Sequence, residues 1–428
     1  MSKRLIFVAV PLLSAALLLV ALTWVTPFAA AEDQTPVPAV VPQPEPRQNN
    51  TADWVISDMS FESNYPDGFT FRIKAESSGG AIENARLVWY RPSLRETDVL
   101  RVYAEDVTYD AASGVYSATW QPDSLQMVPP WVLVKYHWEF RDAVGNEYET
   151  EPALAEYTDD TRAWTRSESE EAIVFASDLP DEINAMVLDA MAQQADQYLT
   201  VWGAPLPYKP RIVLFGNYSA WLEWRTADNN VSETSVVVGQ TFDEWGTIAQ
   251  VVFSVDNEDL TELAYSTVVH EIEHLYQNEF LSARRRMDTP GWFFEGDATF
   301  FELQQSYDYL GRVRGYAAEG ILPPLLTVNP ADGPDIGGAN PRWGYDIGYS
   351  FFVWMETLND DLSVHNQVMT LLAQDVPFFD ALEAATGMDR ATIESEWRVW
   401  LGASAAVPQL IPTWTPAFPV IGTPSVGS

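Results

Sequence analysis

Short runs that alternate apolar and polar residues fill the chain from Thr51 to about Asp160. The runs are rich in valine and aromatic residues, and turn signals such as Pro66-Asp67-Gly68 separate them. Several short strands at this spacing are typical of a sandwich of the immunoglobulin or fibronectin kind. We therefore predict an N-terminal all-β domain over residues 51–160. Its expected strands are Phe69–Ala75, Ala85–Tyr90, Val115–Trp120 and Trp131–Arg141.

The pattern changes to helical spacing after residue 160. Apolar residues from Ile183 to Trp202 recur at helical intervals and stop at Gly203. Compact strands follow, and from Asp259 onward the pattern is mostly helical. Strands followed by helices indicate an α+β domain, which we place at residues 161–405. Its compact strands are expected at Arg211–Phe215, Ser235–Gly239 and Gln250–Val255.

The two ends of the chain have a different composition. Residues 1–31 read as an export signal, because two basic residues precede a long apolar stretch and Ala29-Ala30-Ala31 forms a small-residue cleavage site. The apolar stretch is also long enough to remain as an uncleaved membrane anchor. Residues 32–50 form a Pro-rich linker, and residues 406–428 form a disordered tail. We therefore expect a secreted or cell-surface protein, with a membrane contact only through that anchor.

Charge and cysteine content exclude several functions. Asp plus Glu residues number 61 and Lys plus Arg residues 24, so the formal net charge is −37. Nucleic-acid binding requires a basic surface, so this charge argues against a nucleic-acid partner. The absence of cysteine excludes thiol catalysis, Fe–S clusters, cysteine-based zinc sites and disulfides.

The segment His270-Glu271-Ile272-Glu273-His274 carries the chemistry. It lies in a stretch, Asp259–Phe280, that we expect to be one helix opened by Asp259 and Glu262 as a capping pair. Two histidines four residues apart lie on one helix face and can bind a single Zn²⁺. Glu271 is then placed to take a proton from metal-activated water. Glu273 is expected to be a surface charge.

A catalytic zinc needs a third protein ligand. Cysteine is absent, His137 reads as an ordinary strand residue, and His365 lies far along the chain with no supporting pattern. A carboxylate is therefore expected, and Glu295 is the best candidate. It lies in a very aromatic segment that reads as a helix from Gly291 to about Tyr307, where a buried carboxylate needs a partner. Asp297 and Glu302 are the alternatives.

These motifs resemble those of the gluzincin metallopeptidases, more narrowly the peptidase MA-like family. The resemblance lies in His-Glu-x-x-His followed by Trp292-Phe293-Phe294-Glu295-Gly296-Asp297-Ala298, and it covers about residues 160–405. It implies that Glu295 is the third zinc ligand. The later Tyr345-Asp346-Ile347-Gly348 resembles the family's Tyr-x-x-Gly helix start, which implies that Tyr345 stabilises the oxyanion; Tyr349 is the alternative.

The resemblance also bears on substrate. The Gly-x-Met-Glu-Asn motif of the aminopeptidase branch is missing, which favours an endopeptidase. In related enzymes a strand just before the zinc helix pairs with the extended substrate, and Gln250–Val255 is either that edge strand or an interior one. The basic run Arg284-Arg285-Arg286 is expected to be a solvated loop, or else an anchor for a substrate carboxylate.

The sequence thus predicts an extracytoplasmic zinc peptidase that acts on proteins or peptides. Two other functions stay open. One is a cell-surface binding protein with a structural or degenerate zinc-peptidase fold, and the other is a zinc hydrolase that acts on non-peptide bonds.

Overall fold

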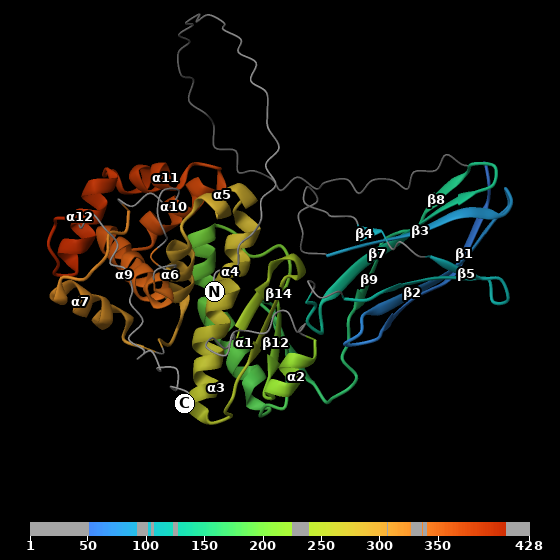
Figure 1. The fold of residues 1–428 in the computed structure, drawn as a ribbon, viewed down its shortest axis with the longest axis horizontal. Coiled ribbons are helices and arrows are strands. Elements are labelled where there is room, and N and C mark those ends of the chain that lie inside the picture. Colours follow the sequence, from blue (N-terminus) through green and yellow to red (C-terminus); the bar gives the residue numbers. More distant parts are fainter. Residues whose placement is uncertain are drawn as a thin grey trace, which may run out of the picture. The chain divides into compact units, whose positions relative to one another are not determined.

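The structure is a computed structural model. It describes residues 51–407 except 92–101, 104–106, 123–126, 225–238, 306, 327–335 and 337–339. The expected export signal, the Pro-rich linker and residues 408–428 of the expected tail lie outside the described residues. The N-terminal part of the described chain consists of β-sheets and the C-terminal part of helices, as expected for a multidomain architecture (Figure 1).

Two antiparallel sheets precede residue 160. One has the strand order β1-β2-β6-β5 and the other β4-β3-β7-β8, with β9 also paired to β7. Alternate residues of β2 and β7, among them Phe71 and Trp138, point into a shared aromatic core, which explains the alternating pattern of the sequence. The predicted strand Val115–Trp120 is confirmed as β6, and His137 lies in β7 as expected. The strands are β1 Trp54–Ser63, β2 Phe69–Ser77, β3 Ile82–Tyr90, β4 Val102–Tyr103, β5 Thr108–Asp110, β6 Val115–Trp120, β7 Leu133–Asp142, β8 Glu147–Glu149 and β9 Ala153–Glu156.

The third sheet has the order β10-β11-β12-β14-β13, and its three central strands run parallel. Both faces of these strands are buried, and β11 and β12 accordingly each contain a run of four apolar residues. Val174 and Ile212 belong to the core shared with the helices, while Phe175 and Val213 belong to the opposite face with Trp221. The strands are β10 Thr165–Glu168, β11 Ile173–Ser177, β12 Arg211–Phe215, β13 Gly239–Phe242 and β14 Thr247–Val251.

The strand order of this sheet shows which strands lie at its edges. The predicted strand Gln250–Val255 corresponds to β14, which ends at Val251 and is an interior strand between β12 and β13. Its edge strands are β10 and β13, and β13 runs antiparallel to β14. The expected strand Ser235–Gly239 overlaps β13 only at Gly239, and residues 235–238 lie outside the described residues.

The stretch predicted as one helix, Asp259–Phe280, has three parts. A short α3 and a π-helical turn, Leu263–Thr267, precede α4, which carries both histidines. Asp256, and not Asp259, is the N-cap, because its side chain accepts hydrogen bonds from the backbone N–H groups of Glu258 and Asp259. The sequence pattern alone does not reveal the extra residue that a π turn inserts.

The remaining helices form the C-terminal part. The segment predicted to be helical to about Tyr307 is a shorter helix, α6, which ends at Phe301. None of the helices in the described part of the chain is long and apolar enough to cross a membrane. The helices are α1 Glu182–Trp202, α2 Tyr218–Glu223, α3 Asn257–Glu262, α4 Val268–Phe280, α5 Ala283–Asp288, α6 Gly291–Phe301, α7 Tyr309–Glu319, α9 Pro341–Asn359, α10 Ser363–Ala373, α11 Phe378–Thr386 and α12 Arg390–Trp400.

Helices α6 and α9 cross in direct backbone contact. A Cβ atom on Gly296 would lie 2.3 Å from the carbonyl carbon of Gly348, and one on Gly348 would lie 2.3 Å from the carbonyl oxygen of Trp292. Only glycine permits this approach. The crossing matters for the site, because Glu295 adjoins Gly296 on α6 and Tyr345 lies one turn from Gly348 on α9.

We expect Gly348→Ala to force α6 and α9 apart. Backbone atoms cannot move aside as a flexible side chain can, so overpacking should lower the free energy of unfolding by about 1–3 kcal/mol. Urea unfolding measures this. Gly315→Ala in α7 is the matched control, because a Cβ there meets nothing within 4 Å. It should be neutral or stabilising, as alanine favours helices; equal losses in both variants would contradict the account.

Candidate metal centre

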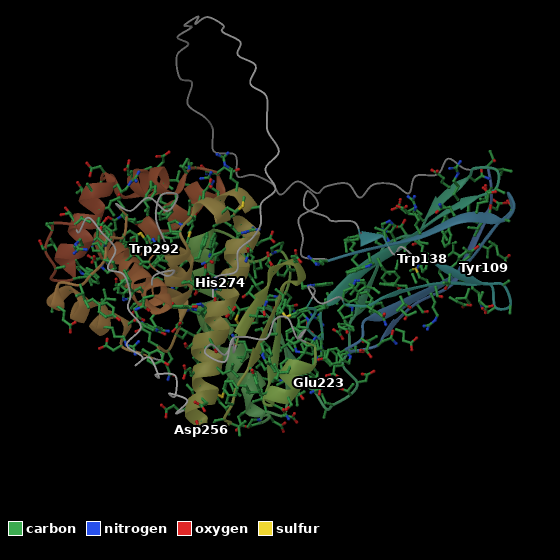
Figure 2. The ribbon with its side chains drawn as sticks, in the orientation of Figure 1. Tyr109, Trp138, Glu223, Asp256, His274 and Trp292 are labelled. Atoms are coloured by element: carbon green, nitrogen blue, oxygen red, sulfur yellow. The ribbon has the colours of Figure 1, made fainter. Side chains whose placement is uncertain are left out.

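Two histidines on one face of α4 form the base of the site. His270 and His274 are one helical turn apart, and their ring centroids lie 5.0 Å from each other. The opposite side of α4 is fixed in the core by Val269 and Ile272, which are fully buried. Figure 2 shows His274 on α4, which lies between the third sheet and the C-terminal helices.

Glu295 on α6 completes a three-ligand group. Its Oε2 atom lies 3.3 Å from Nε2 of His270 and 3.7 Å from Nε2 of His274. The three ligand atoms all lie within 4.8 Å of one another. Ligands at about 2.0–2.1 Å from a tetrahedral Zn²⁺ are themselves about 3.3 Å apart, so these residues fit a zinc ion.

The outer nitrogens of both histidines have hydrogen-bond partners that fix the rings. Nδ1 of His274 donates to Oε1 of Gln277 over 2.8 Å, and Nδ1 of His270 lies 3.3 Å from Oε1 of Glu302. With Nδ1 as the donor to these partners, each Nε2 faces Glu295 and offers a lone pair to a metal ion once its own proton is displaced. Such partners are the usual second layer of histidine-based metal sites.

The two alternative third ligands lie behind the site. Glu302 contacts the far side of the His270 ring and also accepts hydrogen bonds from Ser266 and Tyr309. Asp297 is fully buried and accepts a hydrogen bond from Nε2 of Gln277 over 3.0 Å. Neither carboxylate joins the three-ligand group.

Sequence reasoning missed the residues that support the ligands. Gln277 has no role in the motif, although its position three residues after His274 on the same helix was a usable signal. His365 has no predicted role, yet its Nε2 atom lies 2.9 Å from Oδ1 of the buried Asp297. No local pattern in the sequence indicates the contact between His365 and Asp297.

Glu273 is not a surface charge, as the sequence had suggested. It is fully buried, and both carboxylate oxygens accept from Nε1 of Trp202, at 3.0 and 3.2 Å. Burial and the neighbouring Asp297 raise its pKa well above the ordinary value, which favours a protonated carboxyl. This contact ties the end of α1 to the helix that carries the histidines.

The site strongly favours positive charge. Burial alone would lower the pKa of His270, but hydrogen bonds to Glu295 and Glu302 outweigh it and raise the pKa to about 10. The pKa of His274 is raised by Glu295 in the same way, again against burial. Burial opposes ionisation of Glu295, yet the two histidines hold its pKa well below the usual range. The three side chains therefore attract a proton or a metal cation.

Glu271 faces the open side of the group. Its Oε2 accepts a hydrogen bond of 2.5 Å from Oγ1 of Thr241 on the edge strand β13. A Cβ on Gly239 would lie 3.0 Å from the other oxygen, Oε1, so β13 passes close to this carboxylate. Strand β13, the histidines and Glu295 together line an open cleft of about 490 Å³.

Tyr345 lines the same cleft. Its ring stacks on that of His270, with centroids 5.6 Å apart, and burial together with the charges of Glu295 and Glu271 raises its pKa. The phenol therefore stays protonated and can donate a hydrogen bond. Tyr349 is placed differently: its hydroxyl accepts from Gln305 and its ring packs near Tyr309, so it is not part of the cleft lining.

The basic run is a short helix, α5, and not a solvated loop. Arg285 is almost fully buried and contacts Asp288, Asp375 and the carbonyl oxygen of Val376. Arg284 is exposed, while Arg286 lines the cleft. The three consecutive arginines therefore lie in three different environments.

A second group of metal-binding residue types lies on β7 and β8. His137 and Glu139 share one face of β7, and Glu149 stands opposite Glu139 across the strand pair. Nε2 of His137 lies 3.6 Å from Glu139 and 3.3 Å from Glu149. Unlike the group on α4, it has no carboxylate next to its histidine in the chain that could act as a general base.

Comparison with solved structures finds zinc metallopeptidases of the aminopeptidase N family at low identity. One is an aminopeptidase N family protein from Idiomarina loihiensis, with 9% identity and a TM-score of 0.33 over 80% of this chain and 72% of that chain. Another is an M1 zinc metallopeptidase from Deinococcus radiodurans, with 10% identity and a TM-score of 0.37 over 83% and 94%. No family model and no curated protein matches the chain.

We expect Gln277→Ala to weaken zinc binding by about 10- to 100-fold, because the His274 ring loses the acceptor that orients it. Competition with a chromogenic chelator measures the affinity. Gln193→Ala, which removes an exposed glutamine of α1 that pairs with Asp189, is the control and should leave the affinity unchanged. An unaltered affinity in Gln277→Ala would show that the hydrogen bond does not orient the ligand.

Zinc affinity should rise with pH. With the pKa of His270 near 10 in the metal-free site, zinc must displace a proton from this ring throughout the neutral range. The apparent affinity should therefore increase by about tenfold per pH unit between roughly pH 6.5 and 8.5. Chelator competition at three pH values tests this, with the chelator's own titration corrected. A flat profile would mean that His270 is already unprotonated.

Proposed function

We propose that this chain is an extracytoplasmic zinc-dependent peptidase of the gluzincin type, with an immunoglobulin- or fibronectin-like sandwich before the catalytic domain. One observation carries the proposal: Nε2 of His270, Nε2 of His274 and Oε2 of Glu295 converge at zinc-ligand distances, with Glu271 beside them at an open cleft. A purely structural zinc site needs neither the general base nor the opening.

His270, His274 and Glu295 would hold the ion. When bound, zinc polarises a water molecule and the substrate carbonyl, which makes hydrolysis possible at neutral pH. Glu271 accepts the proton of the attacking water on its carboxylate and then delivers it to the leaving amine. The hydroxyl of Thr241 holds one oxygen of this carboxylate, so the other is free to receive the proton.

The oxyanion of the tetrahedral intermediate needs a hydrogen-bond donor. The Tyr345 hydroxyl is suited to this role, since its raised pKa keeps the proton on oxygen and its ring is fixed against His270. A positioned donor of this kind contributes on the order of 3 kcal/mol of transition-state stabilisation. Tyr349 is the weaker candidate, because it does not line the cleft.

Strand β13 would bind the peptide backbone. It is the edge of its sheet, and its outer side has no strand partner among the described residues. An extended substrate can add to such an edge by main-chain hydrogen bonds. Gly239 and Thr241 lie on β13 directly beside Glu271, so a peptide bound there passes the ligand group.

An endopeptidase fits better than an aminopeptidase. The strand reads Gly239-Gln240-Thr241-Phe242 and lacks the Met-Glu-Asn residues with which the aminopeptidase branch binds a free amine. The basic and apolar start of the chain supports a secreted or cell-surface location, and the net charge of −37 disfavours nucleic acid as a partner.

Glu271→Gln tests the proposal. The amide keeps the shape and can still accept from Thr241, but it cannot take a proton, so kcat should fall by about 10²- to 10⁴-fold. Zinc content, measured by atomic absorption, should not change. Cleavage is measured with a fluorogenic peptide library.

The alternative function, a surface binding protein with a degenerate site, gives a different result. Wild-type protein would then bind zinc but cleave no member of the library, and Glu271→Gln would make no difference. Hydrolysis of non-peptide esters alone would point to the other zinc hydrolases.

A further inference from the structure

Three consecutive arginines in an acidic protein have three different partners. Arg284 is exposed and lies 3.6 Å from Asp288, and Arg285 is buried with Asp288 and Asp375. Arg286 alone of the three lines the cleft that contains the zinc-ligand group. Surface charge balance accounts for the first, core packing accounts for the second, and neither accounts for the third.

The guanidinium of Arg286 is held in place by backbone. Its Nη1 donates to the carbonyl oxygens of Asn278 and Leu281, both over 2.8 Å. These carbonyls belong to the end of α4, where helices favour cations. The contacts use one nitrogen, so the remaining N–H groups of the fork are available for an anion.

Arg286 has no carboxylate partner within 4.0 Å in the part of the chain that the structure describes, although acids outnumber bases by 61 to 24. Other arginines of the helical part, Arg312 and Arg342, both lie within that distance of Asp346. An arginine that is fixed in a cleft and lacks an anion is suited to bind one from outside.

The charges of the cleft favour an anionic ligand once the site is loaded. Among the described lining residues, only Glu271, Glu295 and Arg286 carry a formal charge when both histidines are neutral. A bound dication balances the two carboxylates. Arg286 then leaves the cleft with one net positive charge.

The spacing between Arg286 and the zinc ligands can be estimated along α4. Arg286 bonds the carbonyl of Asn278, which is one turn beyond His274, or about 6 Å along the helix. An extended peptide advances about 3.4 Å per residue. In a peptide extended along α4, a carboxylate near Arg286 therefore belongs to a residue one or two positions from the bond at the metal.

We propose that Arg286 is a specificity-determining residue that binds a substrate carboxylate one or two residues from the scissile bond. The inference rests on the proposed peptidase function. The carboxylate has two possible sources: an Asp or Glu side chain within a longer peptide, or the C-terminal carboxylate of a peptide that ends there. The planar fork of arginine suits either source by a bidentate contact.

The test uses the zinc-loaded full chain and peptides that the library profile shows to be cleaved. One arm replaces each of the two positions on either side of the scissile bond by Glu, Gln or Lys. The other arm compares peptides that end one to three residues beyond the bond as free acids or as amides. The measured quantity is the ratio of kcat/KM for the carboxylate to that for its neutral counterpart.

We expect a ratio of about 10 to 100 in the wild type at one position or in the free-acid arm, and a ratio near 1 in Arg286→Gln. Arg286→Lys keeps the charge but not the fork and should give an intermediate ratio. Arg286→Glu should prefer the Lys peptide. A raised ratio with the Glu peptides identifies a side-chain carboxylate as the ligand of Arg286. A raised ratio with the free-acid peptides identifies the C-terminal carboxylate.

Arg284→Gln is the matched control, since it removes an adjacent arginine outside the cleft, and its ratio should equal that of the wild type. Melting temperature and zinc content are recorded for every variant, and Arg286→Lys carries the test if Arg286→Gln does not fold. Cleavage with the same ratio in wild type and Arg286 variants overturns this inference alone. A wild type that cleaves no peptide overturns the proposed function as well.

Discussion

The structure depends on the convergence of three electron-rich atoms that repel one another unless a cation lies between them. Two imidazole nitrogens and one carboxylate oxygen meet at 3.3–3.7 Å, and the ring of His270 is almost completely buried. A protein gains nothing from such an arrangement in the absence of positive charge. The raised pKa values of both histidines likewise show that the site favours positive charge. Folding energy from elsewhere must therefore hold the ligands in place.

That energy comes from contacts behind the ligand helices. The backbone of α4 is held by Tyr198, whose hydroxyl donates to the carbonyl of Val269 over 3.0 Å, and by the contact between Trp202 and Glu273. Helix α6 is held against α9 by the glycine crossing at Gly296. The ligands therefore extend from two helices that are each fixed by contacts distant from the metal. These contacts hold the ligand-bearing helices independently of the ligand atoms, as a preorganised metal site requires.

The sequence predicts the parts of the site that local spacing determines. The i, i+4 histidines must share a helix face, and a carboxylate in an aromatic helix must find a partner; the structure brings His270, His274 and Glu295 together. Short strands such as Arg211–Phe215 are likewise predicted from their apolar runs. The sequence does not predict contacts made across the fold. Glu273 is buried, and its hydrogen-bond donor Trp202 lies 71 residues earlier in the chain.

The predictions that the structure corrects also concern features that the local sequence pattern does not determine. Three arginines in a row look solvated, because the residues that enclose Arg285 come from a segment about ninety positions later. Strand β11 is missing from the predicted elements, although its four apolar residues match the run in Arg211–Phe215 that predicts β12; a run this short has no period and is ambiguous. The N-cap expected at Asp259 follows from the capping-pair spacing of Asp259 and Glu262, whereas the structure has it three residues earlier, at Asp256. In each case tertiary structure decided what the local pattern left open.

The overall charge and the local charge of this protein have opposite consequences. A formal net charge of −37 repels anions at long range, and the proposed carboxylate-binding cleft must act against this repulsion. Salt reduces such long-range repulsion beyond about 8 Å at physiological ionic strength. Within that distance the field is set by the few groups of the cleft, where Arg286 is held by two backbone carbonyls. For the proposed peptide substrate, the acidic surface would therefore slow the approach of an anionic peptide, while the groups of the cleft would determine which peptide stays bound.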